Sequence, residues 1–355
     1  MKSLRNLLVV AVILAACGGT DADELIPIRL QLQWSTQAQF AGYFAAIEQG
    51  FYNDAGLDVT ILEGAVDIVP QQVLAAGGAE FGLAWVPKAL VSREEGADLV
   101  NIAQVFQRSG TLEVAWADSG ITEPAHWDGK RVGTWGFGNE FELTAAFEKY
   151  DVTPSEIIQQ PFDMSLLLNN ELDAAQAMTY NEYAQVLEQE NPETGELYTP
   201  EDLAVIDFNE IGTAMLQDAV WAEATWLAEN EETAQAFLKA SFQGWIYCRD
   251  NPDACVQTVL DRGSALGASH QAWQMNEISA LIWPSPAGIG VMDKALWDQT
   301  LEVAVGQGVI TAEPDADAYR TDLAEAAVAE LETEGLDATG DSFQKAIVTL
   351  NPGGE

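Results

Sequence analysis

The sequence predicts an α/β protein with two doubly wound lobes. Apolar runs typical of strands alternate with helical patterns of about ten residues, as in sheets covered by helices. This alternation is interrupted by turn residues at 118–128 and then starts again, and from 223 to 329 the chain is largely helical. We therefore expect a two-lobed clamshell whose lobes are joined by crossovers near residues 112–120 and 205–220.

The first lobe is expected to begin with a strand, because residues 26–33 alternate apolar and polar side chains. A helix follows, with aromatic and aliphatic residues three or four apart on one face, and Gly50 ends it. The same criteria predict further strands at 57–62, 80–85, 98–106 and 112–117, and helices at 66–76 and 87–96.

The second lobe repeats this pattern. We expect strands at 131–135 and 172–178, helices at 139–149, 165–170 and 181–189, and two short strands within 204–217. No internal repeat of 20–50 residues is apparent, which excludes a solenoid.

The amino-acid composition excludes some classes of binding partner. The 355 residues are 48% hydrophobic, enough for a large core. There are 15 Lys and Arg against 56 Asp and Glu, a net charge of −41. Such a surface repels phosphate backbones and anionic lipid headgroups, so nucleic-acid partners and basic membrane docking are excluded.

The N-terminus has the features of an export signal. Lys2 and Arg5 precede an apolar run too short to span a bilayer, and the run ends in Leu-Ala-Ala-Cys-Gly. This ending resembles a bacterial lipobox, in which Cys17 is acylated. We expect an exported protein, lipid-anchored to the outer face of the cytoplasmic membrane, with a signal peptide at 1–16 and a tether at 17–24.

Two further cysteines, Cys248 and Cys255, flank an Asn-Pro break between helices. In an oxidising compartment they either form a disulfide or remain buried free thiols, and spacing alone does not decide between the two. No metal site is expected, because the two histidines, His126 and His270, stand far from each other and from any cysteine. We expect both histidines at the surface or in loops.

Candidate binding residues follow the predicted strands, at the edge where ligands bind in open α/β sheets. Most of these strand ends pair an aromatic ring with an amide or carboxylate, which suits a flat heteroaromatic ligand. The candidates are Trp34, Gln37, Gln39, Phe40, Trp85, Trp135, Asn139, Glu140, Tyr180, Asn181 and Glu182. Glycines such as those of Gly136-Phe137-Gly138 can bind a phosphate after a strand. Here Glu140 follows them and no Lys or Arg stands in the first turn of the helix, so a neutral ligand is favoured over a phosphate.

Several segments together carry a family resemblance. They are 39–52, 56–59, 132–135, 139–140, 178–182 and 288–290. The chain resembles the substrate-binding lipoproteins of the thiamine-pyrimidine/sulfonate-binding superfamily. The Gln-Ala-Gln-Phe-Ala-Gly-Tyr run at 37–43 and the Tyr-Asn-Glu motif at 180–182 look most like the branch that binds riboflavin or formylaminopyrimidine for ABC importers.

The resemblance implies a type II periplasmic-binding-protein clamshell, with lobe one at 25–115 plus 216–330, lobe two at 116–215 and a C-terminal extension at 331–355. It implies a monomer that takes a vitamin or vitamin precursor to an ABC permease, without a cofactor. The number of tryptophans favours riboflavin, whereas Glu182 or Glu140 would suit the amino group of formylaminopyrimidine.

Two other functions remain as alternatives. Sulfonate or other anion binding would use an arginine, and only Arg108 and Arg131 fall near the expected cleft. Eukaryotic relatives are enzymes that make the thiamine pyrimidine from a histidine and a lysine-bound pyridoxal phosphate. This chain lacks lysine between Lys2 and Lys88 and has no histidine before His126, so we do not expect an enzyme.

Overall fold

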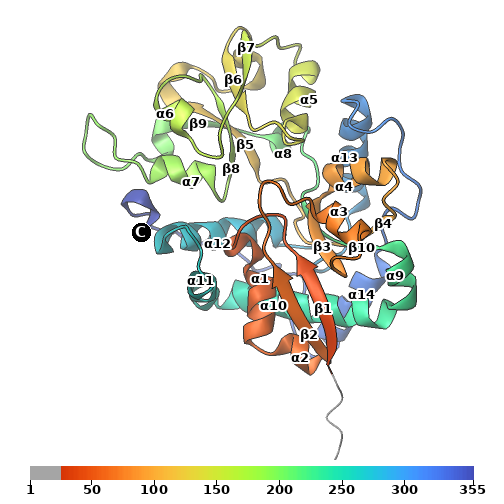
Figure 1. Cartoon of the computed structure of the whole chain (residues 1–355). Helices are drawn as coiled ribbons and strands as arrows, with labels where there is room; N and C mark the ends of the chain where they lie inside the picture. The colour runs from red at the N-terminus through yellow and green to blue at the C-terminus, as the bar shows by residue number, and fades with distance from the viewer. Residues whose placement is uncertain (1–24) are drawn as a thin grey trace, which may run out of the picture.

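The computed structural model describes residues 25–355, so the expected signal peptide, Cys17 and the tether lie outside the described residues. The described chain forms two lobes, one above the other in Figure 1, each built on its own β-sheet. No helix in this part of the chain is long and apolar enough to cross a membrane.

The sheet of the first lobe has five strands in the order β2-β1-β3-β10-β4. β1 is parallel to both β2 and β3, whereas β10 is antiparallel to β3 and β4. The strands are β1 (Ile26–Gln31), β2 (Leu57–Leu62), β3 (Phe81–Trp85), β4 (Leu99–Gln104) and β10 (Asp218–Glu223). The early strands and their parallel pairing follow the sequence prediction.

The second lobe repeats this arrangement. β8 (Ala175–Met178), β5 (Thr111–Trp116) and β9 (Leu203–Asp207) form an antiparallel group, and β6 (Arg131–Thr134) pairs in parallel with β7 (Glu156–Gln159). A parallel bridge from Val132 to Ala174 joins the two groups. The combined order is β7-β6-β8-β5-β9. In each lobe one strand runs antiparallel to its two neighbours, β10 in the first lobe and β5 in the second, and each is the first strand after a crossover.

One strand assignment from the sequence was wrong. β5, expected in the first lobe, pairs with β8 and β9 of the second, so the chain crosses at 105–110, before β5. The turn residues at 118–128 come after β5 and therefore mark a loop within the second lobe. The crossing segment is mostly buried, so its composition does not stand out from that of the strands beside it.

The return crossover also differs from the prediction. Instead of two strands within 204–217, β9 is followed by the short helix α8 (Phe208–Ile211) and then by a non-strand segment at 212–217. Gln217 ties the two crossovers together: its Nε2 donates to Ser109 Oγ at 3.0 Å and to Thr111 Oγ1 at 2.7 Å, and its Oε1 accepts from the Gly110 N–H at 2.8 Å.

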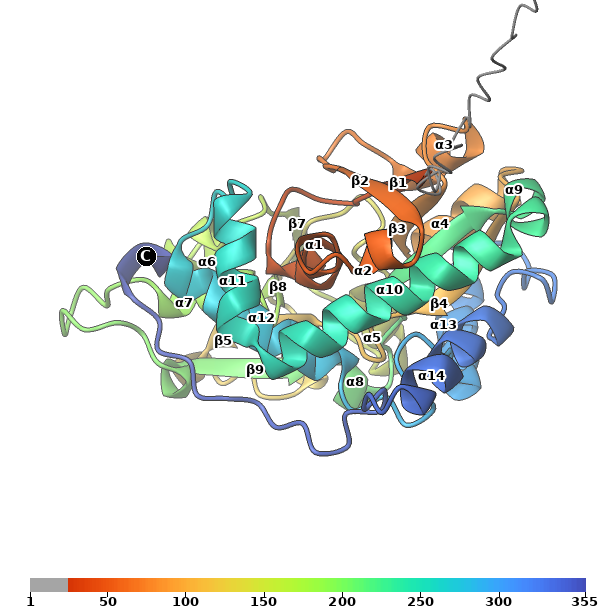
Figure 2. The same ribbon diagram turned by 90° about the horizontal axis from the view of Figure 1, so that it is seen from below.

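Helices cover both faces of the sheets, and α10 runs along the base of the first lobe (Figure 2). The remaining helices are α1 (Ala41–Glu48), α2 (Phe51–Asp54), α3 (Pro70–Ala75), α4 (Val86–Glu94), α5 (Phe141–Lys149), α6 (Ser165–Leu168), α7 (Glu182–Leu187), α9 (Ala224–Glu229), α10 (Glu231–Asp250), α11 (Pro252–Asp261), α12 (Ala268–Ile282), α13 (Lys294–Gly306) and α14 (Asp322–Thr333).

Two glycines allow α1 and α10 of the first lobe to pack closely. A Cβ at Gly42 would overlap the Trp245 ring, and one at Gly244 would overlap the carbonyl oxygen of Gly42. Beside this contact, Phe81 of β3 stacks on Phe237 with ring centroids 4.0 Å apart. The apolar face expected for the first helix is therefore buried against α10.

The structure joins Cys248 and Cys255 in a disulfide, with their Cα atoms 5.5 Å apart. Cys248 lies near the end of α10 and Cys255 in the first turns of α11, and both are fully buried. The bond fixes the sharp turn at Asn251-Pro252 between these helices, which is the turn that the Asn-Pro pair predicts.

The chain after α14 contacts α12 through Asn276 and Ala346, and both ribbon views show its end near α7 of the second lobe (Figures 1 and 2). Lys345 Nζ lies 2.5 Å from Glu277 Oε1 on α12. Near the end, the Gly353 N–H donates to the Glu188 carbonyl oxygen at 3.0 Å. The C-terminal segment thus contacts both lobes.

Candidate functional site

A cavity of about 440 Å³ lies between the lobes, where the carboxyl ends of β1 and β3 face the loops after β6, β7 and β8. Such volumes are typical of pockets that hold small organic ligands. Most of the residues predicted from the strand ends line it. They are Trp34, Gln37, Gln39, Trp85, Trp135, Asn139, Tyr180, Asn181 and Glu182.

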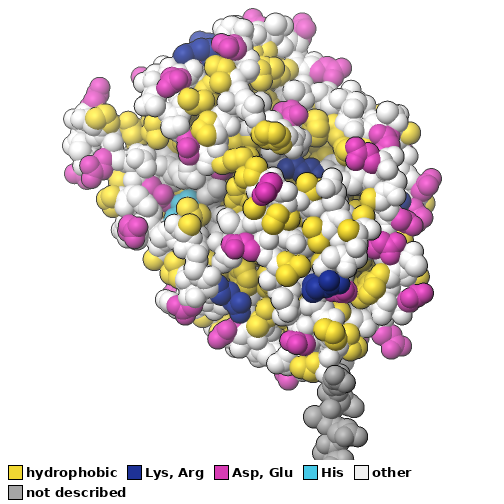
Figure 3. Space-filling view, in the orientation of Figure 1, with side chains coloured by type: hydrophobic (Ala, Val, Ile, Leu, Met, Phe, Trp, Pro, Cys, Tyr) yellow, Lys and Arg dark blue, Asp and Glu magenta, His cyan; other side chains and the backbone are white. Residues whose placement is uncertain are grey.

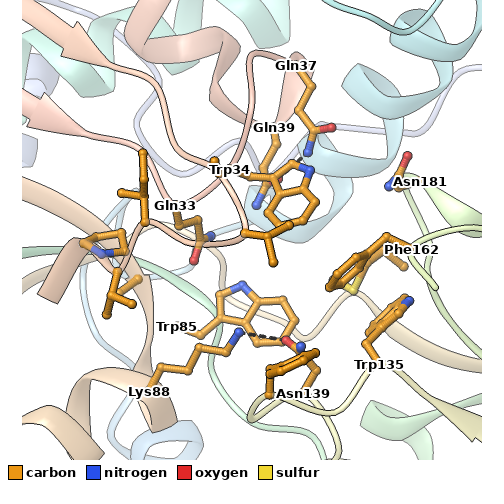
Figure 4. A pocket seen from close by; sticks show the side chains of 18 of the residues that line it. Gln33, Trp34, Gln37, Gln39, Trp85, Lys88, Trp135, Asn139, Phe162 and Asn181 are labelled. Carbon is orange, nitrogen blue, oxygen red and sulfur yellow. Dashed lines mark hydrogen bonds between the residues drawn. The ribbon is translucent and has the colours of Figure 1, made fainter. Parts of the chain in front are cut away.

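Aromatic rings from both lobes face this cavity (Figure 4). Trp34 and Trp85 come from the first lobe, and Trp135 and Phe162 from the second. Phe162 lies 5.0 Å from Trp34 and 6.1 Å from Trp135, centroid to centroid, and is nearly parallel to Trp135 at 19°. Rings of both lobes thus line the cavity, and Trp34 and Phe162 contact each other across the cleft.

Asp218 lies behind the cavity wall and bonds to three of the residues that line it. Its carboxylate accepts from Gln33 Nε2 at 2.6 Å, Trp85 Nε1 at 2.9 Å and Gln39 Nε2 at 2.9 Å. Burial raises the pKa of Asp218 to about 6, although these hydrogen bonds and the charge of Lys88 oppose the shift. Asp218 thus fixes the orientation of three side chains that line the cavity.

Lys88, in the first turn of α4, reaches across the cleft. Its Nζ donates to Asn139 Oδ1 of the second lobe at 2.9 Å and lies 4.9 Å from the centroid of the Trp85 ring (Figure 4). Burial lowers the pKa of Lys88 to about 8, opposed by the negative charges of Glu140 and Asp218. The side chain carries a positive charge at neutral pH.

Asn181 and Glu182 are held by a buried network on the other side of the cavity. Glu182 Oε2 accepts from the Met178 N–H at 3.0 Å, and Glu182 Oε1 accepts from Asn181 Nδ2 at 2.8 Å. Behind them His270 contacts Asn181 Oδ1 through Nε2 at 3.0 Å and Glu188 Oε1 through Nδ1 at 2.7 Å. The placement of His270 at the surface was wrong, since it is 1% exposed.

Two predicted binding residues do not line the cavity. Phe40 is fully buried in the core of the first lobe, because it lies on the inward face of the helical segment. Glu140 Oε2 instead accepts from the Gly138 N–H at 2.9 Å, at the head of α5. Neither candidate arginine lines the cavity either: Arg108 donates to the Pro284 carbonyl at 3.0 Å, and Arg131 pairs with Asp173 at 2.7 Å.

Sequence reasoning missed Lys88, Phe162 and Asp218. Lys88 follows a predicted strand end by three residues, so it lies one helical turn beyond the positions where binding residues are expected. Phe162 follows β7, a strand that was not predicted. Asp218 opens β10, and because β10 is antiparallel its first residue lies opposite Trp85, at the carboxyl end of β3.

The described residues 25–355 contain no group of three or more His, Cys, Asp or Glu side chains placed to hold a metal ion. The cavity is instead lined by rings, amides, the carboxylate of Glu182 and the ammonium of Lys88, with Asp218 directly behind the lining. This set can stack on a planar ring and form hydrogen bonds along its edge.

Comparison with known proteins gives the family. A model of the family described as NMT1/THI5 like matches residues 37–255, which include most of the cavity wall. The chain belongs to the NMT1/THI5-like family. The match covers both crossovers and every strand of the two lobes except β1.

Relatives of this NMT1/THI5-like chain include a formylaminopyrimidine-binding protein of Halalkalibacterium halodurans, 24% identical over 269 residues, which are 73% of this chain and 79% of the relative. The riboflavin-binding protein RibY of Chloroflexus aurantiacus is 22% identical over 320 residues, 85% of this chain and 86% of that protein. A 4-amino-5-hydroxymethyl-2-methylpyrimidine phosphate synthase of Aspergillus parasiticus is 20% identical over 242 residues, 66% and 70% of the two chains.

Among solved structures, the putative periplasmic sulfonate-binding protein SsuA of Methylobacillus flagellatus superposes with a TM-score of 0.61 at 16% identity, covering 89% of this chain and 98% of the other. The alkanesulfonate-binding protein SsuA of Xanthomonas axonopodis gives 0.59 at 14% identity, with 84% and 99% covered. The α/β fold of this NMT1/THI5-like chain is that of the periplasmic binding proteins, as the sequence predicted.

Proposed function

We propose that the chain is the substrate-binding protein of an ABC importer, and that it captures riboflavin between its lobes and delivers it to a membrane permease. The observation that carries this proposal is the set of rings from both lobes that face one cavity. A planar tricyclic ligand stacks on rings from both sides at once, which couples binding to closure of the lobes.

The hydrogen-bonding groups of the cavity also favour riboflavin. Glu182 and Asp218 already accept N–H groups of the protein on both carboxylate oxygens. Lys88 retains donors, and the buried Trp135 Nε1 has no hydrogen-bond partner within residues 25–355. Donors in excess suit a ligand edge rich in carbonyl oxygens and ring nitrogens, as the pyrimidinedione of riboflavin is.

Formylaminopyrimidine is the second candidate. A relative named for binding it matches 73% of this chain, and Glu182 lies in the cavity wall where a carboxylate would meet an amino group. Its single ring would fill less of the cavity and would stack on fewer of the four rings. A sulfonate is disfavoured because both candidate arginines are engaged outside the cavity.

A binding role agrees with the side chains present. The synthase chemistry expected of eukaryotic relatives needs a lysine and a histidine in the first part of the fold, where this chain has neither before Lys88 and His126.

We further propose export and lipid anchoring through Cys17, and a monomeric state. Replacing Cys17 and following membrane association of the expressed protein tests the anchor.

The test of the ligand is calorimetric titration of the purified protein with riboflavin and, separately, with formylaminopyrimidine. Submicromolar binding of riboflavin, with formylaminopyrimidine at least about tenfold weaker, supports the proposal. Tight binding of the pyrimidine alone would assign the second candidate. Binding of neither, with an intact fold, would overturn the vitamin-binding proposal.

A further inference from the structure

Lys88 is the one cationic side chain that lines the cavity within residues 25–355, and not all of its hydrogen-bond donors are paired with protein acceptors there. Its ammonium has three N–H donors. Asn139 Oδ1 accepts one of them, and no second acceptor lies within hydrogen-bonding distance in the described chain. Two donors are therefore left for a ligand or for water.

The position of the ammonium is fixed from two sides. Trp85 supplies a ring face 4.9 Å away, and Asn139 of the opposite lobe supplies the acceptor. Asp218 orients Trp85 through its indole N–H at 2.9 Å, while Asn139 Nδ2 is tied to the Gly136 carbonyl oxygen at 2.7 Å. Both partners of Lys88 are thus held in place by the protein.

The two acidic side chains near Lys88 do not accept hydrogen bonds from its ammonium. Asp218 accepts from Gln33, Gln39 and Trp85, and Glu140 from the Gly138 N–H. Both act on Lys88 only through their charge, which favours the ammonium form and opposes the effect of burial. A ligand acceptor in the cleft would meet a charged donor in a partly desolvated site, where such hydrogen bonds are strong.

We propose that Lys88 is the specificity-determining residue of the cleft, whose ammonium donates to an acceptor on the edge of the ring system and so selects carbonyl-bearing rings over rings without that edge. This inference rests on the proposed function, because it requires the ligand to bind between the lobes. Stacking residues bind any flat ring, whereas Lys88 distinguishes one edge from another.

The test uses two matched ligands and two forms of the protein. Lumichrome carries a pyrimidinedione edge, and 2,3-dimethylphenazine has the same three-ring outline with a benzene ring in place of that edge. Lys88→Met keeps the length and apolar stem of the side chain and removes the donors. We expect Lys88→Met to weaken lumichrome and riboflavin binding at least about tenfold, and dimethylphenazine binding less than about twofold.

Lys88→Gln, which restores neutral donors, should bind lumichrome with intermediate affinity and keeps the test valid if the methionine variant folds poorly. Lys294→Met is the matched control, because Lys294 pairs with Asp298 on the exposed side of α13 and lies outside the cavity. It should bind all three ligands as the unmodified protein does.

The outcomes separate the two proposals. Absence of riboflavin and lumichrome binding in the unmodified protein overturns the proposed function and this inference with it. Binding by the unmodified protein that Lys88→Met leaves intact, or weakens equally for both ring systems, overturns the role of Lys88 alone. Loss of alkanesulfonate binding in Lys88→Met, without riboflavin binding in the unmodified protein, would assign Lys88 to an anion.

Discussion

At the scale of single residues, the cleft combines broad stacking surfaces with a few oriented polar groups. Most residues of the cavity wall could be predicted from the sequence, because ligands bind at the carboxyl ends of parallel strands and apolar runs indicate where those strands end. Asp218 escaped this reasoning because only the antiparallel pairing of β10 brings it to that edge.

The clearest residue-level prediction concerns Trp135. Replacing it by alanine removes a ring nearly parallel to Phe162 from the second lobe's side of the cavity, so riboflavin binding should weaken by more than about tenfold in calorimetric titration. Trp116→Ala is the control: Trp116 packs on Tyr198 with centroids 4.9 Å apart, outside the cavity, and its loss should leave affinity unchanged. Equal affinities for Trp135→Ala and the unmodified protein would place the ligand elsewhere.

A second prediction concerns Asp218 and pH. Burial raises its pKa from 3.8 to about 6, so the folded chain binds the proton more tightly than the unfolded chain. The free energy of unfolding should therefore fall as pH rises through this interval, and Asp218→Asn should remove that part of the slope. Urea denaturation between these pH values measures it.

The control for this measurement is Asp58→Asn, because Asp58 lies exposed on β2. It should keep the slope of the unmodified protein. Glu142, whose pKa burial raises to about 7, adds a slope of the same sign in every variant, so the difference between variants isolates Asp218. Identical slopes for Asp218→Asn and the unmodified protein would show that Asp218 titrates normally.

At the scale of elements, the lobes touch through side chains as well as through the crossovers. α12 packs on α11 and on the Ala38–Phe40 turn of the first lobe, and its His270 contacts Asn181 and Glu188 at the two ends of α7. Asn181 also lines the cavity, so this contact couples the lobe interface to the binding site.

His270→Ala should therefore lower both stability and affinity. It leaves the buried Glu188 carboxylate without its imidazole partner, at an expected cost of about 2 kcal/mol in the free energy of unfolding. Riboflavin binding should weaken severalfold, since Asn181 loses one of its supports. The matched variant His126→Ala, which alters the exposed histidine, should change neither quantity. The account of this contact fails if both variants behave alike in urea denaturation and titration.

The sequence predicted most elements of this fold within a few residues, from apolar periodicity, glycines and prolines. It misplaced β5 because a buried crossover resembles the strands on either side of it. It missed β7, whose four residues are mostly exposed and carry little apolar pattern. Pairing between distant strands, which local sequence does not encode, decides both cases.

At the scale of the whole molecule, the net charge of −41 is spread over the surface. Figure 3 shows acidic side chains scattered across the face that it presents, with basic groups at few places. Like charges at this density repel one another in the compact state more than in the unfolded chain, so the folded molecule is destabilised at low ionic strength.

The free energy of unfolding should consequently rise as sodium chloride increases from about 0.01 M to about 1 M, over which the screening length falls from about 30 Å to about 3 Å. Urea denaturation at several salt concentrations measures the rise. Choline chloride should give the same increase if screening is its cause. Stability that is flat or declining in both salts would contradict the role assigned to surface repulsion.

Both lobes are required for the central claim, since neither supplies the whole ring set. The most direct measurement is a crystal structure of the protein crystallised with riboflavin. The account predicts the isoalloxazine ring between Trp34 and Trp85 of one lobe and Trp135 and Phe162 of the other, with its pyrimidinedione edge toward Lys88. A riboflavin molecule bound outside this cavity, or an empty cavity under saturating ligand, would contradict it.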